Sequence, residues 1–182
     1  SNLEWRTSDS DEKINFRIGF RRTLDAGRIL ASSVIYTSTR SAVNRSRKAN
    51  ARLSSAHRPS GSAWIWFNRL DYIDERSSGV ISESHTRKLV NNVNINWLPK
   101  RNTQLSLQYG SKYVLDDFNG SSNSGYTDLT WVELRHDLNQ DWDVGLHASM
   151  LHTWKGGEKN YGLGGSLGYK LMDNMWVAAG YN

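Results

Sequence analysis

Hydrophobic and polar residues alternate over long stretches of this chain, most clearly between Trp142 and Met172. Successive side chains of a strand point to opposite sides, so residues of one parity share a face. One face of this segment carries large apolar side chains, namely Trp142, Val144, Leu146, Ala148, Met150, Trp154, Tyr161, Leu163, Leu167, Tyr169 and Leu171. The opposite face is mostly glycine, serine and charged residues. A hairpin of a soluble sandwich could show this pattern, but apolar outside and small or polar inside is typical of a transmembrane β-barrel.

The spacing of two tryptophans favours the membrane interpretation. Trp142 and Trp154 share a face and are twelve residues apart. With a rise of about 3.3 Å per residue and a tilt of about 45°, they would lie about 28 Å apart along the membrane normal. The apolar band of an outer-membrane barrel is about 25 Å tall and has aromatic girdles at both edges. The aromatic residues that we predict at the membrane interfaces are Trp97, Tyr113, Trp142, Trp154, Tyr161 and Trp176.

The same alternation recurs along the chain and predicts eleven strands, from residues 2–6 to residues 175–182. In the strand predicted at 63–73 both faces carry aromatic residues, so its orientation stays open. The strand predicted at 87–98 places Asn92, Asn94 and Asn96 on one face. Asparagine is depleted in ordinary strands, and this row therefore favours a wet, enclosed surface.

The connections between these strands are expected to alternate in length. Short turns are predicted near residues 25, 59, 99, 139 and 172, and longer polar loops at 40–48, 74–85, 116–125 and 155–160. Bacterial outer-membrane barrels show this alternation, whereas a Greek-key sandwich does not need it. A soluble barrel of eleven strands with an apolar interior would leave too much space to fill.

These observations predict an all-β fold: an antiparallel, up-and-down transmembrane β-barrel that forms a single domain over residues 1–182. Bacterial barrels of one chain usually have an even number of strands. The sequence shows eleven strands and stops inside the last one, at Asn182. We therefore expect about twelve strands, with the closing strand after Asn182. If the sequence is instead complete, either residues 2–6 are not a strand or the sheet is open.

The bulk composition limits the alternatives. The net charge is +5, but the arginines are spread over many predicted strands rather than gathered in one patch, so nucleic acid is not an expected partner. The absence of cysteine excludes a disulfide framework and a thiolate metal site. No run approaches the roughly 18 apolar residues of a membrane helix.

The segment GLGGSLGYKLMDNMWVAAGYN, residues 162–182, resembles the penultimate hairpin of the barrels that terminate large, repeat-containing bacterial surface proteins. The shared features are a glycine-alternating strand, an Asp-Asn turn and a strand with Trp176 and Tyr181. The chain departs from that pattern because it contains neither the closing strand with an aromatic end nor preceding repeats. The resemblance implies a Gram-negative outer-membrane location and an anchoring role. The partners would be outer-membrane lipid, including lipopolysaccharide, and other subunits of a surface or secretion assembly.

The polar face of the predicted strands would line the barrel lumen, because charges on a lipid face cost about 2 to 4 kcal/mol each at the midplane. The residues that we predict in the lumen are Arg17, Arg21, Arg52, Arg69, Asn92, Asn94, Asn96, Lys112, Glu133, Arg135, Asp143, His147 and Lys170. Their mixed signs suggest ion pairs across a narrow lumen. A surplus of arginine could instead give a weakly anion-selective pore.

The sequence contains little that indicates catalysis. His147 and His152 should face opposite sides of one strand, and no metal-ligand motif is present, so we expect no metal and no cofactor. Ser149 shares a face with His147 and Asp143, but neighbours two apart on a strand lie about 6.6 Å from each other, too far for a direct Ser–His hydrogen bond. We assign no catalytic residue and expect no enzyme. The favoured function is a membrane anchor or translocation unit, followed by a narrow diffusion pore and then by an outer-membrane enzyme.

Overall fold

The computed structural model describes residues 2–8, 10–173 and 175–181. They form the strands β1 (Asn2–Thr7), β2 (Asp11–Asp25), β3 (Arg28–Ser41), β4 (Asn44–His57), β5 (Trp64–Gly79), β6 (Glu83–Lys100), β7 (Thr103–Phe118), β8 (Ser121–Asp137), β9 (Trp142–Thr153), β10 (Glu158–Met172) and β11 (Met175–Tyr181). Asn174, in a predicted turn, and Asn182, in the last predicted strand, lie outside this part of the chain. Within it, no helix has the length and apolar character needed to cross a membrane.

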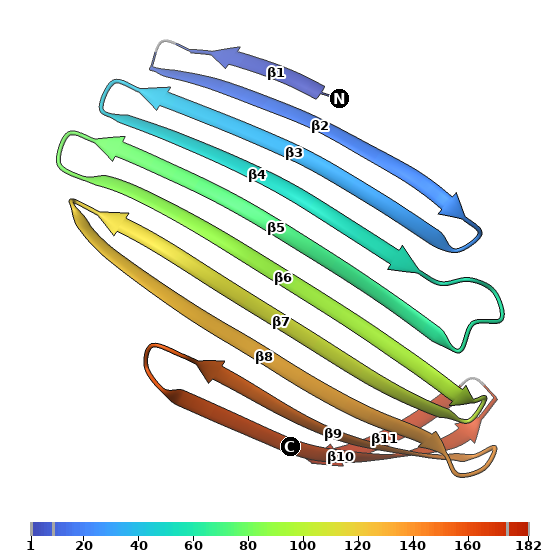
Figure 1. Ribbon diagram of the computed structural model, residues 1–182. Helices are drawn as coiled ribbons and strands as arrows, with labels where there is room; N and C mark the ends of the chain where they lie inside the picture. The colour runs from blue at the N-terminus through green and yellow to red at the C-terminus, as the bar shows by residue number, and fades with distance from the viewer. Residues whose placement is uncertain (1, 9, 174, 182) are drawn as a thin grey trace.

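The eleven strands form one antiparallel sheet in which their spatial order equals their order in the chain (Figure 1). The predicted all-β, up-and-down fold is therefore confirmed. The sheet is open over the described residues, because β1 pairs only with β2 and β11 only with β10. The two edge strands lie at opposite ends of the sheet, so the expected barrel is not closed over the described residues.

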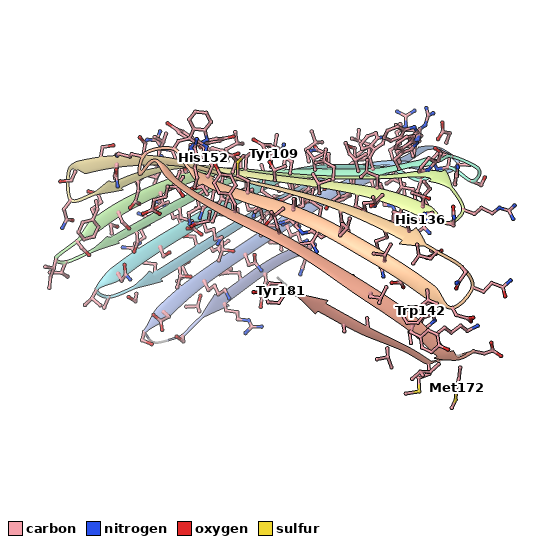
Figure 2. The ribbon with its side chains drawn as sticks, turned by 90° about the horizontal axis from the view of Figure 1, so that it is seen from below. Tyr109, His136, Trp142, His152, Met172 and Tyr181 are labelled. Carbon is pink, nitrogen blue, oxygen red and sulfur yellow. The ribbon has the colours of Figure 1, made fainter. Side chains whose placement is uncertain are left out.

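The register of the strands defines two faces. One row of directly paired residues runs across five strands through Trp64, Trp97, Leu105, Leu134 and Leu146. We call the face that carries this row the apolar face and the opposite face the polar face. The sheet is arched, with its edge strands below its middle strands, and Tyr109 and His152 of the apolar face lie on the upper, convex side (Figure 2).

The sheet has no hydrophobic core. No hydrophobic side chain among the described residues is buried, and the accessible surface is 13050 Å². A globular protein of 20.7 kDa would expose about 9,000 Å². The apolar face therefore has nothing of its own to pack against, as expected for a surface that meets lipid.

Several polar groups in the middle of the apolar face are paired with one another. In hydrocarbon an unpaired polar group would cost several kcal/mol, so such pairing is required there. The bonds are Asn68 Nδ2 to Asn91 Oδ1 at 2.9 Å, the hydroxyls of Tyr109 and Tyr126 at 2.9 Å, and Trp154 Nε1 to Asp128 Oδ1 at 2.6 Å. The carboxylate of Asp128, a residue only 8% exposed, is thus compensated by an indole N–H.

The predicted long loops are wrong, because the strands continue through most of these residues. We call the edge of the sheet with the connections 26–27, 58–63, 101–102 and 138–141 the turn rim, and the opposite edge, with 42–43, 80–82, 119–120 and 154–157, the extension rim. On β5 the apolar face turns from Tyr72 to Asp74 and Arg76, yet the strand runs on to Gly79. Polar segments can pair in a ladder as well as apolar ones, so polarity alone does not mark a loop.

A tight turn explains why residues 116–125 form a hairpin. Asn119 has φ 46° and Gly120 has φ 82°, as the central residues of a type I′ turn require. Asn-Gly is the residue pair that this turn prefers, because both of its central positions need a positive φ. Polar strands are therefore joined here by two residues alone.

We expect Gly120→Ala to destabilise the folded protein by about 1 kcal/mol, because a side chain in the left-handed region costs about 1 to 2 kcal/mol. Gly125→Ala is the matched control, since Gly125 has ordinary backbone angles and an added methyl group would meet open space at both positions. Urea unfolding in detergent, followed by tryptophan fluorescence, measures both. Equal midpoints for the two variants would contradict the turn assignment.

Candidate functional site

The residues predicted in the lumen all lie on the polar face. The direct pairs Arg69 with Asn92, Glu133 with His147, and Gln104 with Arg135 show that these side chains project from the same side of the sheet. The remaining predicted residues follow from the same register: Arg17, Arg21, Arg52, Asn94, Asn96, Lys112, Asp143 and Lys170. The polar face is therefore the candidate functional surface.

A buried carboxylate holds two arginines at the middle of this face. Asp71 of β5 is 2% exposed and accepts hydrogen bonds from Arg52 Nε at 2.7 Å and Arg69 Nε at 2.6 Å. Both guanidinium groups are partly exposed, at 37% and 42% of their side-chain area. Since each arginine bonds Asp71 through Nε, its terminal amino groups remain available on the polar face.

A second acid bridges two lysines nearer the extension rim. Glu75 contacts Lys48 Nζ at 2.5 Å and Lys88 Nζ at 2.9 Å. It lies beyond Tyr72, the last aromatic residue of β5 on the apolar face, and so outside the membrane-spanning part of the strand. The hydrogen bond from Lys48 and that from Lys88 lower the pKa of the Glu75 carboxyl, against a smaller effect of burial. This cluster ties β4, β5 and β6 together.

The glycines on the polar face of β10 make room for side chains of β9. A Cβ at Gly168 would lie 2.5 Å from Oδ1 of Asp143, so the Asp143 carboxylate lies flat over the glycine. Arg135 of β8 approaches the same carboxylate at 3.9 Å. The glycine row thus lets polar side chains spread along the face instead of standing away from it.

Trp176 is the one predicted interface residue that lies on the other face. It pairs directly with Lys170, and it lines a cleft of about 760 Å³ together with Gln104, Arg135 and Asp143. This cleft lies at the turn rim. The register shift between Lys170 and Met172 sets which residues of β11 face it.

The other five predicted interface aromatics lie on the apolar face, near its two edges. At the turn rim Trp97 stacks on Trp64 with ring centres 5.4 Å apart, and Trp142 contacts Tyr169 at 4.6 Å. Toward the extension rim Trp154 contacts Tyr126 at 5.9 Å. Tyr113 pairs with Tyr126, and Tyr161 pairs with Met150.

The candidate catalytic group is not assembled. Asp143, His147 and Ser149 share the polar face, but no hydrogen bond joins any two of them among the described residues. The His147 ring lies 6.2 Å from that of Trp131 instead. Within the same part of the chain, no three His, Asp or Glu side chains gather as they would around a metal ion. The absence of enzymatic activity stays a prediction.

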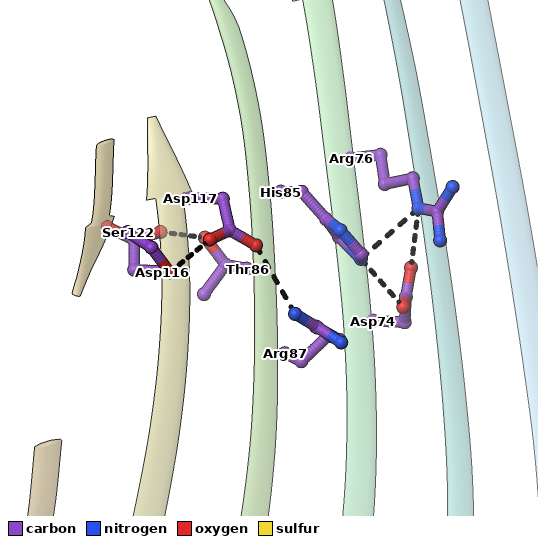
Figure 3. A network of polar contacts seen from close by, with 8 residues as sticks. All are labelled: Asp74, Arg76, His85, Thr86, Arg87, Asp116, Asp117 and Ser122. Atoms are coloured by element: carbon purple, nitrogen blue, oxygen red, sulfur yellow. Dashed lines mark hydrogen bonds and ion pairs between the residues drawn. The ribbon is translucent and has the colours of Figure 1, made fainter. Parts of the chain in front are cut away.

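Charged residues on β5, β6 and β7 form a network at the extension rim (Figure 3). His85 Nε2 lies 2.9 Å from Asp74 Oδ2 and 3.2 Å from Arg76 Nε. One ring nitrogen cannot donate to Asp74 and accept from Arg76 at once, so the tautomer of the His85 ring decides which of the two bonds forms. Nearby, Arg87 and Ser122 both contact Asp117, and the Ser122 hydroxyl, with a smaller contribution from Arg87, lowers the pKa of its carboxyl.

Arginines line the extension rim on the side of the apolar face. Arg40 pairs directly with Arg45, and Arg47 with Arg76. All four side chains are exposed, and no described acid forms an ion pair with Arg40, Arg45 or Arg47. Like charges directly opposite each other destabilise a sheet, so this surface favours an anionic partner.

Asp71 is the main residue that sequence reasoning missed. Its parity matches that of Arg69 on the same strand, which would have placed both on one face. The residues predicted in the lumen include Arg69 of this strand but not the acid two positions further on. Glu75 and Lys48 escape notice because the sequence predicts loops at their positions, and Lys88 is left out although it lies in the strand predicted at 87–98.

Comparison of the sequence with protein-family models and with curated proteins gives no match. Among solved structures, the chain is similar to the siderophore receptor PirA from Pseudomonas aeruginosa, with a TM-score of 0.74 and 12% sequence identity over 96% of this chain and 35% of the receptor. The translocator domain of the autotransporter NalP from Neisseria meningitidis aligns with a TM-score of 0.38 and 10% identity over 97% of this chain and 76% of that domain.

The first likeness shows the fold: an outer-membrane β-barrel wall, as the sequence predicted. The chain spans about a third of the receptor's length, so the likeness covers one section of such a barrel. The second superposition is too weak to support an argument.

The assignment of the two faces can be tested at adjacent positions of β6. The chain has no cysteine, so Asn94→Cys and Val93→Cys each introduce a single thiol. In membranes we expect a water-soluble maleimide to label Asn94→Cys and to leave Val93→Cys unlabelled, because lipid excludes the reagent and disfavours the thiolate. Both should react once the protein is unfolded in urea. The reverse pattern in folded protein would contradict the assignment.

Proposed function

We propose that this chain forms a section of the wall of a wide outer-membrane transport barrel, with the polar face lining its lumen. The observation that carries the proposal is the shape of the sheet: eleven strands with one largely apolar face, arched (Figure 2) but open, with β1 and β11 unpaired at its two edges (Figure 1). The fold supports the predicted location, the bacterial outer membrane.

The curvature argues for more strands than the twelve expected from the sequence. Barrel diameter grows roughly linearly with strand number, and barrels of about 22 strands form the large outer-membrane transporters. The superposition on a siderophore receptor over 96% of this chain is consistent with a barrel of that width. Further strands that pair with β1 and β11 would complete it.

A wide lumen suits the chemistry of the polar face. Arg52, Arg69, Lys112 and the asparagine row present charged and hydrogen-bonding groups along the strands. Such a surface lets polar solutes cross between apolar walls. The anchor or translocation role stays a prediction, and it differs from transport in requiring no open path.

The test is ion conductance of the full-length protein in planar bilayers, using the two cysteine variants. We expect steady current, and a bulky water-soluble thiol reagent should reduce it in Asn94→Cys but not in Val93→Cys, because only the first thiol would lie in the path. Folded protein that carries no current would overturn the transport role and favour the anchor.

We also propose that the extension rim faces the outer leaflet and that its arginines contact phosphate groups of the lipid there. Arg45 and Arg47 precede Ala49 of the apolar face on the same strand and so lie between its apolar residues and the rim. A guanidinium group binds phosphate through two hydrogen bonds. A bridging phosphate would offset the like-charge repulsion, roughly 0.2 to 1 kcal/mol per pair.

Lipid A added to detergent-solubilised protein should therefore raise its melting temperature, and the double variant Arg45→Ser, Arg47→Ser should lose most of this rise. Arg101→Ser, which removes a charge at the turn rim, is the control and should keep it. Dephosphorylated lipid A should not raise the melting temperature of the wild-type protein, the double variant or Arg101→Ser. An equal rise in the double variant would exclude these arginines as the phosphate contact.

A further inference from the structure

Four arginines surround a floor of small residues on the polar face of β2 to β5. Arg17 and Arg21 lie on β2, Arg52 on β4 and Arg69 on β5. The positions between them are occupied by small side chains, namely Gly19, Ala31, Ser33 and Ser54. The larger side chains therefore stand around the floor and not on it.

The register gives the dimensions of this arginine patch. One row runs through Arg21, Ala31, Ser54 and Arg69, and the next row of the same face through Gly19, Ser33, Arg52 and Asp71. With strands about 4.8 Å apart, the backbones of Arg21 and Arg69 are about 14 Å apart. Arg17 and Arg21 are separated by four residues, about 13 Å along β2. Arginine side chains from this perimeter can reach one small molecule on the floor.

The patch carries an excess of positive charge. Arg17 lies in a third row of the same face, next to the other two. Across β2 to β5 these three rows contain four arginines and a single acid, Asp71, which gives a net charge of 4 − 1 = +3. No ion pair involves Arg17 or Arg21 among the described residues. The nearest further charge along the Asp71 row is another cation, Lys112, which follows after Val90.

The position of Asp71 makes the patch more than a set of solvated charges. A carboxylate that is 2% exposed fixes two guanidinium groups by their Nε atoms, which restricts their orientation before any ligand arrives. Pre-oriented groups lose less conformational entropy on binding than free side chains do. Their outer edges are the ones that form paired hydrogen bonds with carboxylate or phosphate oxygens.

We propose that the arginine patch binds a small multivalent anion bearing carboxylate or phosphate groups inside the lumen. Arg52 and Arg69 supply the pre-oriented contacts, and Arg17 and Arg21 close on the ligand from the opposite side. The proposal rests on the proposed function, because the patch meets solutes only where the polar face lines the lumen. It specifies the class of solute that the wall would recognise.

The test is calorimetric titration of pyrophosphate into the detergent-folded full-length protein, with sodium chloride of equal ionic strength in the cell. The main variant is Arg17→Gln, Arg21→Gln, because neither residue has an ion pair to lose on folding. Each charge-assisted hydrogen bond contributes about 1.5 to 3 kcal/mol, so we expect the affinity to fall roughly tenfold or more. Arg135→Gln removes a charge from the same face near the turn rim and should change the affinity less than about twofold.

Two results would overturn the proposal. Wild-type protein that does not bind pyrophosphate would exclude the site. Equal losses of affinity in the double variant and in Arg135→Gln would show that pyrophosphate responds to the overall charge of the lumen and not to this patch. Maleimide labelling of Asn94→Cys in the same preparation separates this failure from that of the proposed function. If the folded protein is labelled but does not bind pyrophosphate, the anion site alone is contradicted. If the folded protein is not labelled either, the assignment of the polar face to the lumen is contradicted as well.

Discussion

The structure depends on one constraint: its apolar face has no protein to pack against. A soluble sheet would bury this face in a core, but the described strands bury no hydrophobic side chain at all. A bilayer can cover the same surface with lipid, provided that every backbone group finds a partner in the ladder and that polar side chains find hydrogen-bond partners. The bonds of Asn68 to Asn91 and of Trp154 to Asp128 meet this second condition on the apolar face.

The polar face follows from the same constraint. Charges that lipid would exclude can be placed only on the enclosed side, and there they are arranged rather than scattered. Asp71 lies between two arginines, Glu75 between two lysines, and Asp143 over a glycine beside Arg135. Acids bridging bases from neighbouring strands hold the wall together, while the bases left over determine the sign of the surface that solutes meet.

Strand parity predicted most of this arrangement, and its failures have identifiable causes. Parity placed Arg17, Asn94 and His147 on one face because a period of two is fixed by the pleat. Parity did not determine which face of β11 is apolar, because its two aromatic residues, Trp176 and Tyr181, have opposite parity. The register shift beside the turn determines on which face each of them lies. Parity would also place Asp71 on the face of Arg69, but it does not show that this acid lies between two arginines. Too many residues were predicted in loops, because hydrophobicity does not distinguish a polar strand from a loop. The pair Asn119-Gly120 is the signal in the sequence that would have predicted the hairpin.

The strands continue beyond the apolar part of the sheet at the extension rim, and this affects how the protein can change over evolution. Each rung added between Tyr72 and the connection at 80–82 takes one residue from β5 and one from β6, and raises the rim by about 2.3 Å. Paired insertions of this kind leave the register inside the bilayer untouched. A single inserted residue would have to be absorbed by a bulge or by the connection itself. Lineages should therefore vary the height of these hairpins in two-residue steps, and preserve the lengths of the segments below them.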